Sequence, residues 1–116
     1  MIRDPQRDLV ASSGAGQAPL VSTLADDPDM AELVQVFVQE LPQRIAAIQE
    51  ALAEEDLERL TSLAHQLKGA AGGYGFSPIT EIARLIEHQA RDRMAGEMLR
   101  QTVDELADLC RRASAC

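Results

Sequence analysis

Aromatic residues are scarce in this chain, and tryptophan is absent. The aromatic side chains among its 116 residues are Phe37, Tyr74 and Phe76. A surface that binds single-stranded nucleic acid stacks the bases on several aromatic side chains, so this sequence excludes such a surface. Cysteine is also rare, because Cys110 and Cys116 are too few for a disulfide framework or a zinc site. We therefore expect free thiols in a reducing compartment and no bound metal.

Long apolar runs are missing as well. No stretch reaches the roughly 18 apolar residues of a membrane span, and the start lacks the pattern of a signal peptide. These two absences predict a cytoplasmic protein without membrane insertion. Lys and Arg (11) are outnumbered by Asp and Glu (19), which gives a net charge of −8. Such a chain repels nucleic-acid phosphates and anionic lipids, so neither is an expected partner.

The residues that are present describe one helical domain. Hydrophobic residues make up 46% of the chain and charged residues 26%, a normal globular balance. Residues 1–19 are rich in Pro, Gly and Ser and lack apolar periodicity, so we expect a flexible lead or linker followed by a domain over 20–116. In that domain apolar residues recur at spacings of 3 and 4, and no segment alternates with strand period. The fold class predicted is all-α, an antiparallel four-helix bundle with a short extra N-terminal helix.

Local signals place the first helices. Apolar residues within 20–24 suggest the short extra helix. Asp27 followed by Pro28 predicts the N-cap and first residue of a long helix. Pro42 should bend this helix without ending it, because the apolar stripe resumes in phase. The acidic segment 54–56 is the expected turn to the next helix.

The second half contains three more helices. A helix from Leu57 should end in a glycine-rich segment, with Gly75 as its C-cap. Ser77 and Pro78 predict the N-cap and first residue of the next helix. The last helix is expected to start at about Ala95.

One stripe of the helix from Leu57 carries residues whose side chains could take part in a reaction. His65, Lys68, Gly69 and Gly72 are spaced at i, i+3, i+4 and i+7, which places them on one face of a helix. The apolar stripe of the same helix points elsewhere, so His65 should lie on or near the solvent face.

These residue types suit acceptance of a phosphoryl group. Imidazole titrates near pH 6.5, so at pH 7 much of it is neutral and nucleophilic. A phosphoryl group adds about two negative charges to the ring, and an ammonium one turn away would stabilise them. Lys68 has that position and is the only lysine in the chain. Gly69 and Gly72 each cost about 1 kcal/mol relative to Ala in a helix, so a packing or functional contact, or the helix end, should compensate.

The segment His65-x-x-Lys68-Gly69, followed by small residues and Gly75, resembles the signature of histidine-containing phosphotransfer (Hpt) domains. These are the relay modules of multistep two-component signalling. The resemblance includes an F-x-x-x-x-P pattern ending at Pro42 and extends over roughly residues 20 to 113. A lone HxxKG would be weak, whereas the motif within this helical frame is specific.

The resemblance implies a role for four residues. His65 would carry the phosphoryl group, on Nε2, and Lys68 would support it electrostatically. Gly69 would give room for a docked receiver domain. Glu87 could hydrogen-bond the other imidazole nitrogen and fix the tautomer. The docking surface implied on helix geometry combines Leu33, Val36, Phe37, Gln66 and Gly72.

The expected partners are response-regulator receiver domains, a hybrid sensor kinase, or both. The receiver would supply Mg²⁺ and the catalytic carboxylates, so this chain would be a monomeric phosphocarrier without a cofactor and not an enzyme. It lacks the GxxxxGK[ST] spacing of a P-loop and should not phosphorylate itself from ATP.

Two alternatives remain open at this point. The chain could be a non-catalytic helical adaptor that only binds a receiver, or the phosphoacceptor domain of a chemotaxis-type histidine kinase. Other polar residues have ordinary interpretations: His88 reads as a surface histidine, and Arg91-Asp92-Arg93 as a polar helix end. A metal site built from His65, Glu87 and His88 is conceivable, but such a set is common by chance.

Overall fold

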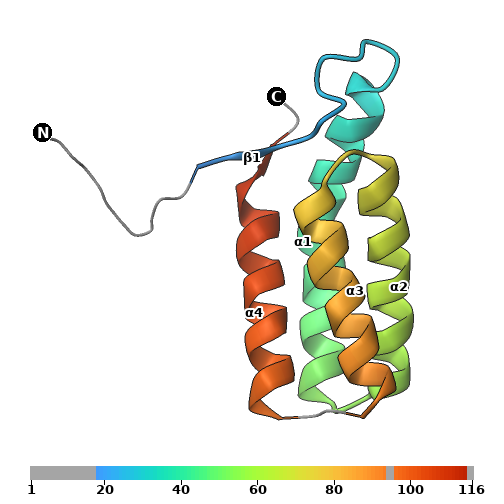
Figure 1. The fold of residues 1–116 in the computed structure, drawn as a ribbon, viewed down its shortest axis with the longest axis vertical. Helices are drawn as coiled ribbons and strands as arrows, with labels where there is room; N and C mark the ends of the chain where they lie inside the picture. The colour runs from blue at the N-terminus through green and yellow to red at the C-terminus, as the bar shows by residue number, and fades with distance from the viewer. Residues whose placement is uncertain (1–17, 94–95, 115–116) are drawn as a thin grey trace, which may run out of the picture.

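The computed structural model describes residues 18–93 and 96–114. Its helices are α1 (Ala31–Ala53), α2 (Leu57–Gly73), α3 (Ser77–Arg91) and α4 (Glu97–Arg112). Consecutive helices run antiparallel, and each packs against two neighbours (Figure 1). The predicted all-α four-helix bundle is therefore confirmed. The predicted lead, residues 1–19, lies outside the described residues except for its last two.

Helix α1 begins later than predicted. The proposed N-cap, Asp27, lies in a turn in which its carboxylate accepts a hydrogen bond from the N–H of Asp29 (2.9 Å). The N–H of Ala31 then bonds the Asp27 carbonyl (2.9 Å), and the helix starts there. A short carboxylate readily closes such a turn two residues along, so Asp27 shapes the approach to the helix instead of capping it. The helix continues unbroken through Pro42 to the acidic turn, as expected.

Both ends of α2 have a specific local cause. At the start, the Asp56 side chain accepts a hydrogen bond from the N–H of Arg59 (3.1 Å), as an N-cap residue does. At the end, Gly75 has a φ of +82°, which L side chains rarely adopt. A Cβ at this position would also lie 2.6 Å from Oγ of Ser22. Only glycine satisfies both constraints. The helix itself ends at Gly73 with Tyr74 at the C-cap, so the prediction of Gly75 as C-cap is wrong by one residue, and Gly75 instead turns the chain just after the cap.

The predicted short N-terminal helix is wrong. Leu20–Val21 forms strand β1, which pairs in parallel with β2 (Ala113–Ser114) after α4. The Ser22 hydroxyl donates to the Tyr74 carbonyl (2.6 Å) and accepts from the N–H of Leu24 (2.9 Å). A few apolar residues do not repay the cost of nucleating a helix, whereas these long-range partners satisfy the backbone directly. The segment therefore ties the end of α2 to the end of α4.

The starts of α3 and α4 differ slightly from the prediction. Helix α3 begins at Ser77 itself, with Phe76 at the N-cap and no side-chain cap, so the prediction of Ser77 as N-cap is wrong by one residue. Phe76 is fully buried, and its packing fixes the chain where the helix starts. Pro78 lies in the first turn, as predicted. The predicted start of α4 at Ala95 lies outside the described residues, and the described helix follows Gly96.

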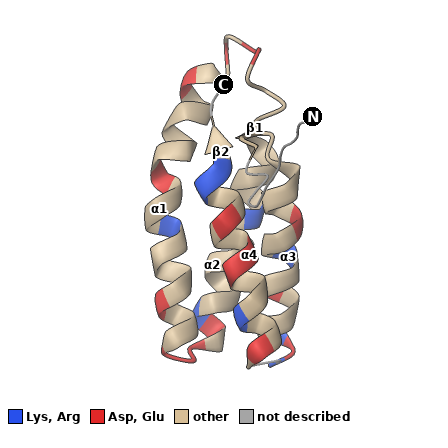
Figure 2. Ribbon diagram, turned by 90° about the vertical axis from the view of Figure 1, so that its left-hand side faces the viewer, with Lys and Arg blue, Asp and Glu red and all other residues tan. Residues whose placement is uncertain are grey.

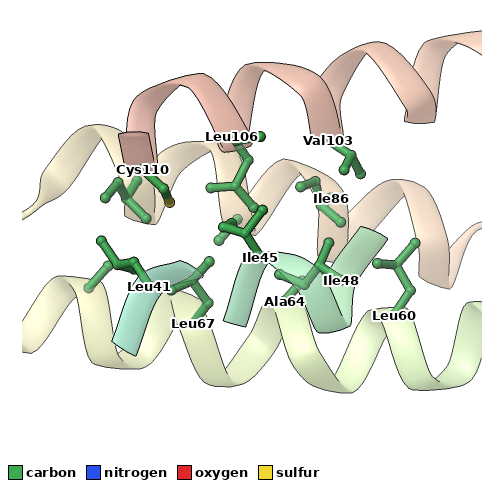
Figure 3. Packing of buried hydrophobic residues seen from close by; sticks show 14 of the residues in the cluster. Leu41, Ile45, Ile48, Leu60, Ala64, Leu67, Ile86, Val103, Leu106 and Cys110 are labelled. Atoms are coloured by element: carbon green, nitrogen blue, oxygen red, sulfur yellow. The ribbon is translucent and has the colours of Figure 1, made fainter. Parts of the chain in front are cut away.

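A single hydrophobic core fills the space between the helices, with one apolar stripe from each (Figure 3). Cys110 belongs to it, and burial raises the pKa of its thiol to about 12, so this cysteine is a packing group. Acidic residues recur along α1, α3 and α4, whereas α2 has only Glu58 in its first turn (Figure 2). None of the helices in the described part of the chain is both long and apolar enough to cross a membrane.

Candidate functional site

His65 lies on the outer face of α2, as its position in the sequence predicted. The core stripe of this helix consists of Leu60, Ala64, Leu67 and Ala71. The stripe points inward and leaves the His65 side chain 64% exposed. The His65 imidazole is therefore accessible to a partner molecule, while the buried side chains of Ala64 and Leu67 hold the helix backbone around it in place.

Glu87 of α3 meets this imidazole from the neighbouring helix. Its side chain is only 3% exposed, and Oε2 lies 3.0 Å from Nδ1 of His65. The pKa of Glu87 is lowered to about 2, so the carboxylate is ionised and can only accept hydrogen bonds. Nδ1 must then carry the proton that it shares with Oε2. In the neutral ring this leaves the lone pair on Nε2.

Two cations contact the same Glu87 carboxylate as His65. Nζ of Lys68 lies 2.8 Å from Oε1 of Glu87, and a guanidinium nitrogen of Arg91 lies 2.6 Å from Oε2. The Lys68 ammonium is the largest cause of the low pKa of Glu87, and the contacts with His65 and Arg91 lower it further. Burial opposes them but is outweighed. The carboxylate is thus held at both oxygens, by residues from two helices.

The structure brings together three of the predicted site residues: His65, Lys68 and Glu87. Lys68 was expected to face a phosphoryl group on His65, and in this state it pairs with Glu87 instead. Arg91 was missed, because it was interpreted as part of a polar helix end. Its i, i+4 spacing from Glu87 is the signal that could have found it, since residues at this spacing meet on a helix surface.

Gly69 has no packing contact that requires glycine. A Cβ at this position would meet no atom of the described residues within 4 Å. At Gly72 the nearest atom would be Oγ1 of Thr80, at an ordinary 3.6 Å. Since no described residue packs against Gly69 to compensate for its helix cost, this position is open to a contact from outside.

A groove between α1 and α2 lies beside Gly69. Its volume is about 560 Å³, and ten residues line it: Met30, Leu33, Val36, Phe37, Glu40, Arg44, Gly69, Ala70, Gly73 and Tyr74. Leu33 is 50% exposed and Val36 47%, so the groove offers apolar surface to solvent. Three residues of the predicted docking surface therefore lie in this groove. The other two, Gln66 and Gly72, are exposed but do not line it.

Within residues 18–93 and 96–114, the structure groups no three His, Cys, Asp or Glu side chains so that they could hold an ion. His88 is exposed on α3 and is not among the contacts of Glu87 described above.

The helical bundle thus presents an exposed histidine in contact with a buried carboxylate. Residues 32–116 match the family model of the Hpt domain, and the chain belongs to this family. It is also similar to the signal transduction histidine-protein kinase BarA of Shigella flexneri, with 32% identity over 87 residues. That match covers 72% of this chain but 10% of BarA. No solved structure gave a significant match. The chain is thus a histidine phosphotransfer module of the phosphorelay type.

Proposed function

We propose that Nε2 of His65 accepts a phosphoryl group from the aspartyl phosphate of one receiver domain and passes it to the aspartate of another. The observation that carries this proposal is the contact of Nδ1 with Glu87. It leaves Nε2 as the nucleophilic nitrogen of an exposed ring. The partner protein can then reach this atom without rearranging the bundle.

The proposed transfer consists of one bond formed and one bond broken. The lone pair of Nε2 attacks phosphorus, an N–P bond forms, and the P–O bond to the donor aspartate breaks. The electron pair of that bond stays with the aspartate as a carboxylate. The proton on Nδ1 remains there, where Glu87 stabilises the positive charge that develops on the ring. Transfer to the next aspartate reverses these steps.

Lys68 and Gly69 have complementary roles in this proposal. Lys68 stands one turn from His65 and brings an ammonium to the transferred group. Gly69 lets the receiver approach the helix beside the groove, where Leu33 and Val36 offer apolar contact. The receiver supplies Mg²⁺ and the catalytic carboxylates, so this chain acts as a monomeric phosphocarrier.

A kinase that uses ATP is the second candidate donor. It is favoured by one observation, the similarity to BarA, whose name is that of a histidine kinase. In that case the same nitrogen of His65 would take the γ-phosphoryl group of ATP bound in another domain.

A transfer assay tests these proposals. The protein is mixed with a panel of radiolabelled phospho-receiver domains, in parallel with a His65→Gln variant and with ATP alone. Acid-labile, base-stable label on the wild type but not on the variant is the expected result. No label from any receiver, with the fold intact, would contradict receiver donation and favour a kinase donor or a receiver-binding adaptor. Label from ATP alone would reveal a nucleotide site in this chain.

A further inference from the structure

The buried carboxylate of Glu87 faces two full positive charges, one more than it needs for neutrality. Lys68 reaches it from α2, the helix of the phosphoacceptor, and Arg91 reaches it from α3. The Arg91 side chain is 58% exposed, so its guanidinium could be fully hydrated. It nevertheless folds back by one turn onto Oε2, the oxygen that also accepts from His65.

The second cation matters once His65 is phosphorylated, and this argument rests on the function proposed above. The phosphoryl group adds about two negative charges next to Lys68. If the Lys68 ammonium turns toward that group, it leaves Glu87. A buried carboxylate that loses its counterion is strongly destabilised, unless another cation is already in place.

Arg91 meets this requirement. Its contact with Glu87 lies within α3 and does not depend on the position of Lys68. The net charge of the site agrees with separate roles for Arg91, which pairs with Glu87, and Lys68, which pairs with the phosphoryl group. Before transfer, Lys68, Arg91 and Glu87 carry a net charge of about +1, and about two negative charges are then added. Without Arg91, one ammonium would have to neutralise both the buried carboxylate and the phosphoryl group.

We infer that Arg91 is a positioning residue of the phosphotransfer site. It keeps Glu87 ionised and in contact with Nδ1 of His65, and so frees Lys68 to stabilise the phosphoryl group. Arg91 itself does not touch the reacting atoms.

The experiment measures loading of His65 by phosphoramidate, a small donor that needs no partner protein. In this reaction the P–N bond of the donor breaks, the bond to Nε2 forms, and ammonia leaves. Arg91→Gln should load about tenfold more slowly than the wild type, equivalent to about 1.4 kcal/mol of transition-state stabilisation. Arg91→Lys should keep most of the rate. The matched control is Arg84→Gln, which removes an arginine from the same helix whose partner, Glu81, is exposed; it should load like the wild type.

A second background separates positioning from a general structural effect. In Glu87→Gln the buried group is neutral and needs no counterion, while its amide oxygen can still accept from Nδ1. Adding Arg91→Gln to this background should therefore cause no further loss of rate. Comparing Glu87→Gln with the double variant also tests the role of Arg91 if the single variant Arg91→Gln fails to fold, because in the double variant no buried carboxylate is left without a counterion.

Each outcome has a distinct meaning. A wild type that takes no label at His65 would contradict the proposed function itself. A wild type that loads while Arg91→Gln loads equally fast would overturn the role of Arg91. A tenfold loss that persists in the Glu87→Gln background would overturn it as well, because Arg91 would then act through another group.

Discussion

Gly69→Ala should make this protein more stable and at the same time a poorer partner for a receiver. Alanine is favoured over glycine in a helix by about 1 kcal/mol. Within residues 18–93 and 96–114, the added Cβ would meet no atom within 4 Å, so no clash there offsets this gain. For a domain of this size, 1 kcal/mol raises the melting temperature by about 4–8 °C. Thermal unfolding followed by circular dichroism measures the shift.

The same methyl group lies on the surface where we propose that the receiver docks. An extra methyl in a well-packed contact costs about 1–3 kcal/mol, so transfer from a phospho-receiver should slow by about fivefold or more. Loading by phosphoramidate, which involves no docking, should be unchanged. The comparison is Gly72→Ala, which lies on the same stripe but does not line the groove, and whose Cβ would make only an ordinary contact at 3.6 Å. If the receiver docks in the groove, Gly72→Ala should slow transfer less than Gly69→Ala. Normal transfer by Gly69→Ala, or a loss of stability, would refute the reasoning.

Three further predictions concern the frame of the site. The pKa of Glu87 is depressed from 4.5 to about 2, so its contribution to stability, at most about 3 kcal/mol, is fully present above pH 4.5 and is lost as the pH falls toward 2. Urea unfolding should show that the stability difference between wild type and Glu87→Gln shrinks over this window, and a difference independent of pH would contradict the ion pairing. Gly75→Ala should lower the free energy of unfolding by about 1–3 kcal/mol, because position 75 has a positive φ and a Cβ there would lie 2.6 Å from Oγ of Ser22. Urea unfolding measures this as well, and an unchanged midpoint would show that the loop relaxes freely. Ala83→Leu should lower the free energy of unfolding by about 1–3 kcal/mol, because the larger side chain overpacks the buried face of α3 one turn before Glu87. ¹⁵N spectra should then show a loss of the Nδ1–H tautomer of His65. An intact tautomer would mean that the contact between His65 and Glu87 tolerates movement of α3.

The helices and the core could be predicted because they depend on local pattern. The i, i+3, i+4 repeat of apolar residues places every stripe inside without reference to distant segments. The end of α2, two residues before Gly75, could be predicted to within a residue from the glycine that turns the chain there. The starts of α1 and α3 were less accurate, because a side chain such as Asp27 can close a turn as easily as it caps a helix.

Two features depend on contacts that no local pattern reveals. Strand β1 exists because its backbone finds β2 at the other end of the chain, and its two residues carry no periodic signal. The pairing of Lys68 with Glu87 likewise joins residues of two helices. The sequence placed Lys68 on the correct face, but it could not show that the ammonium turns to a carboxylate when no phosphoryl group is present.

The division of the site between two helices explains why the core matters for its chemistry. His65 and Glu87 meet at 3.0 Å only if α2 and α3 pack closely along the stretch that carries them. The buried faces beside the site use alanine, namely Ala64 before His65, and Ala83 and Ala90 on either side of Glu87. Small side chains allow a short distance between helix axes, whereas larger ones would hold the axes apart. The tautomer of the exposed histidine is therefore set by a buried carboxylate, and the position of that carboxylate is set by the packing of small residues in the core.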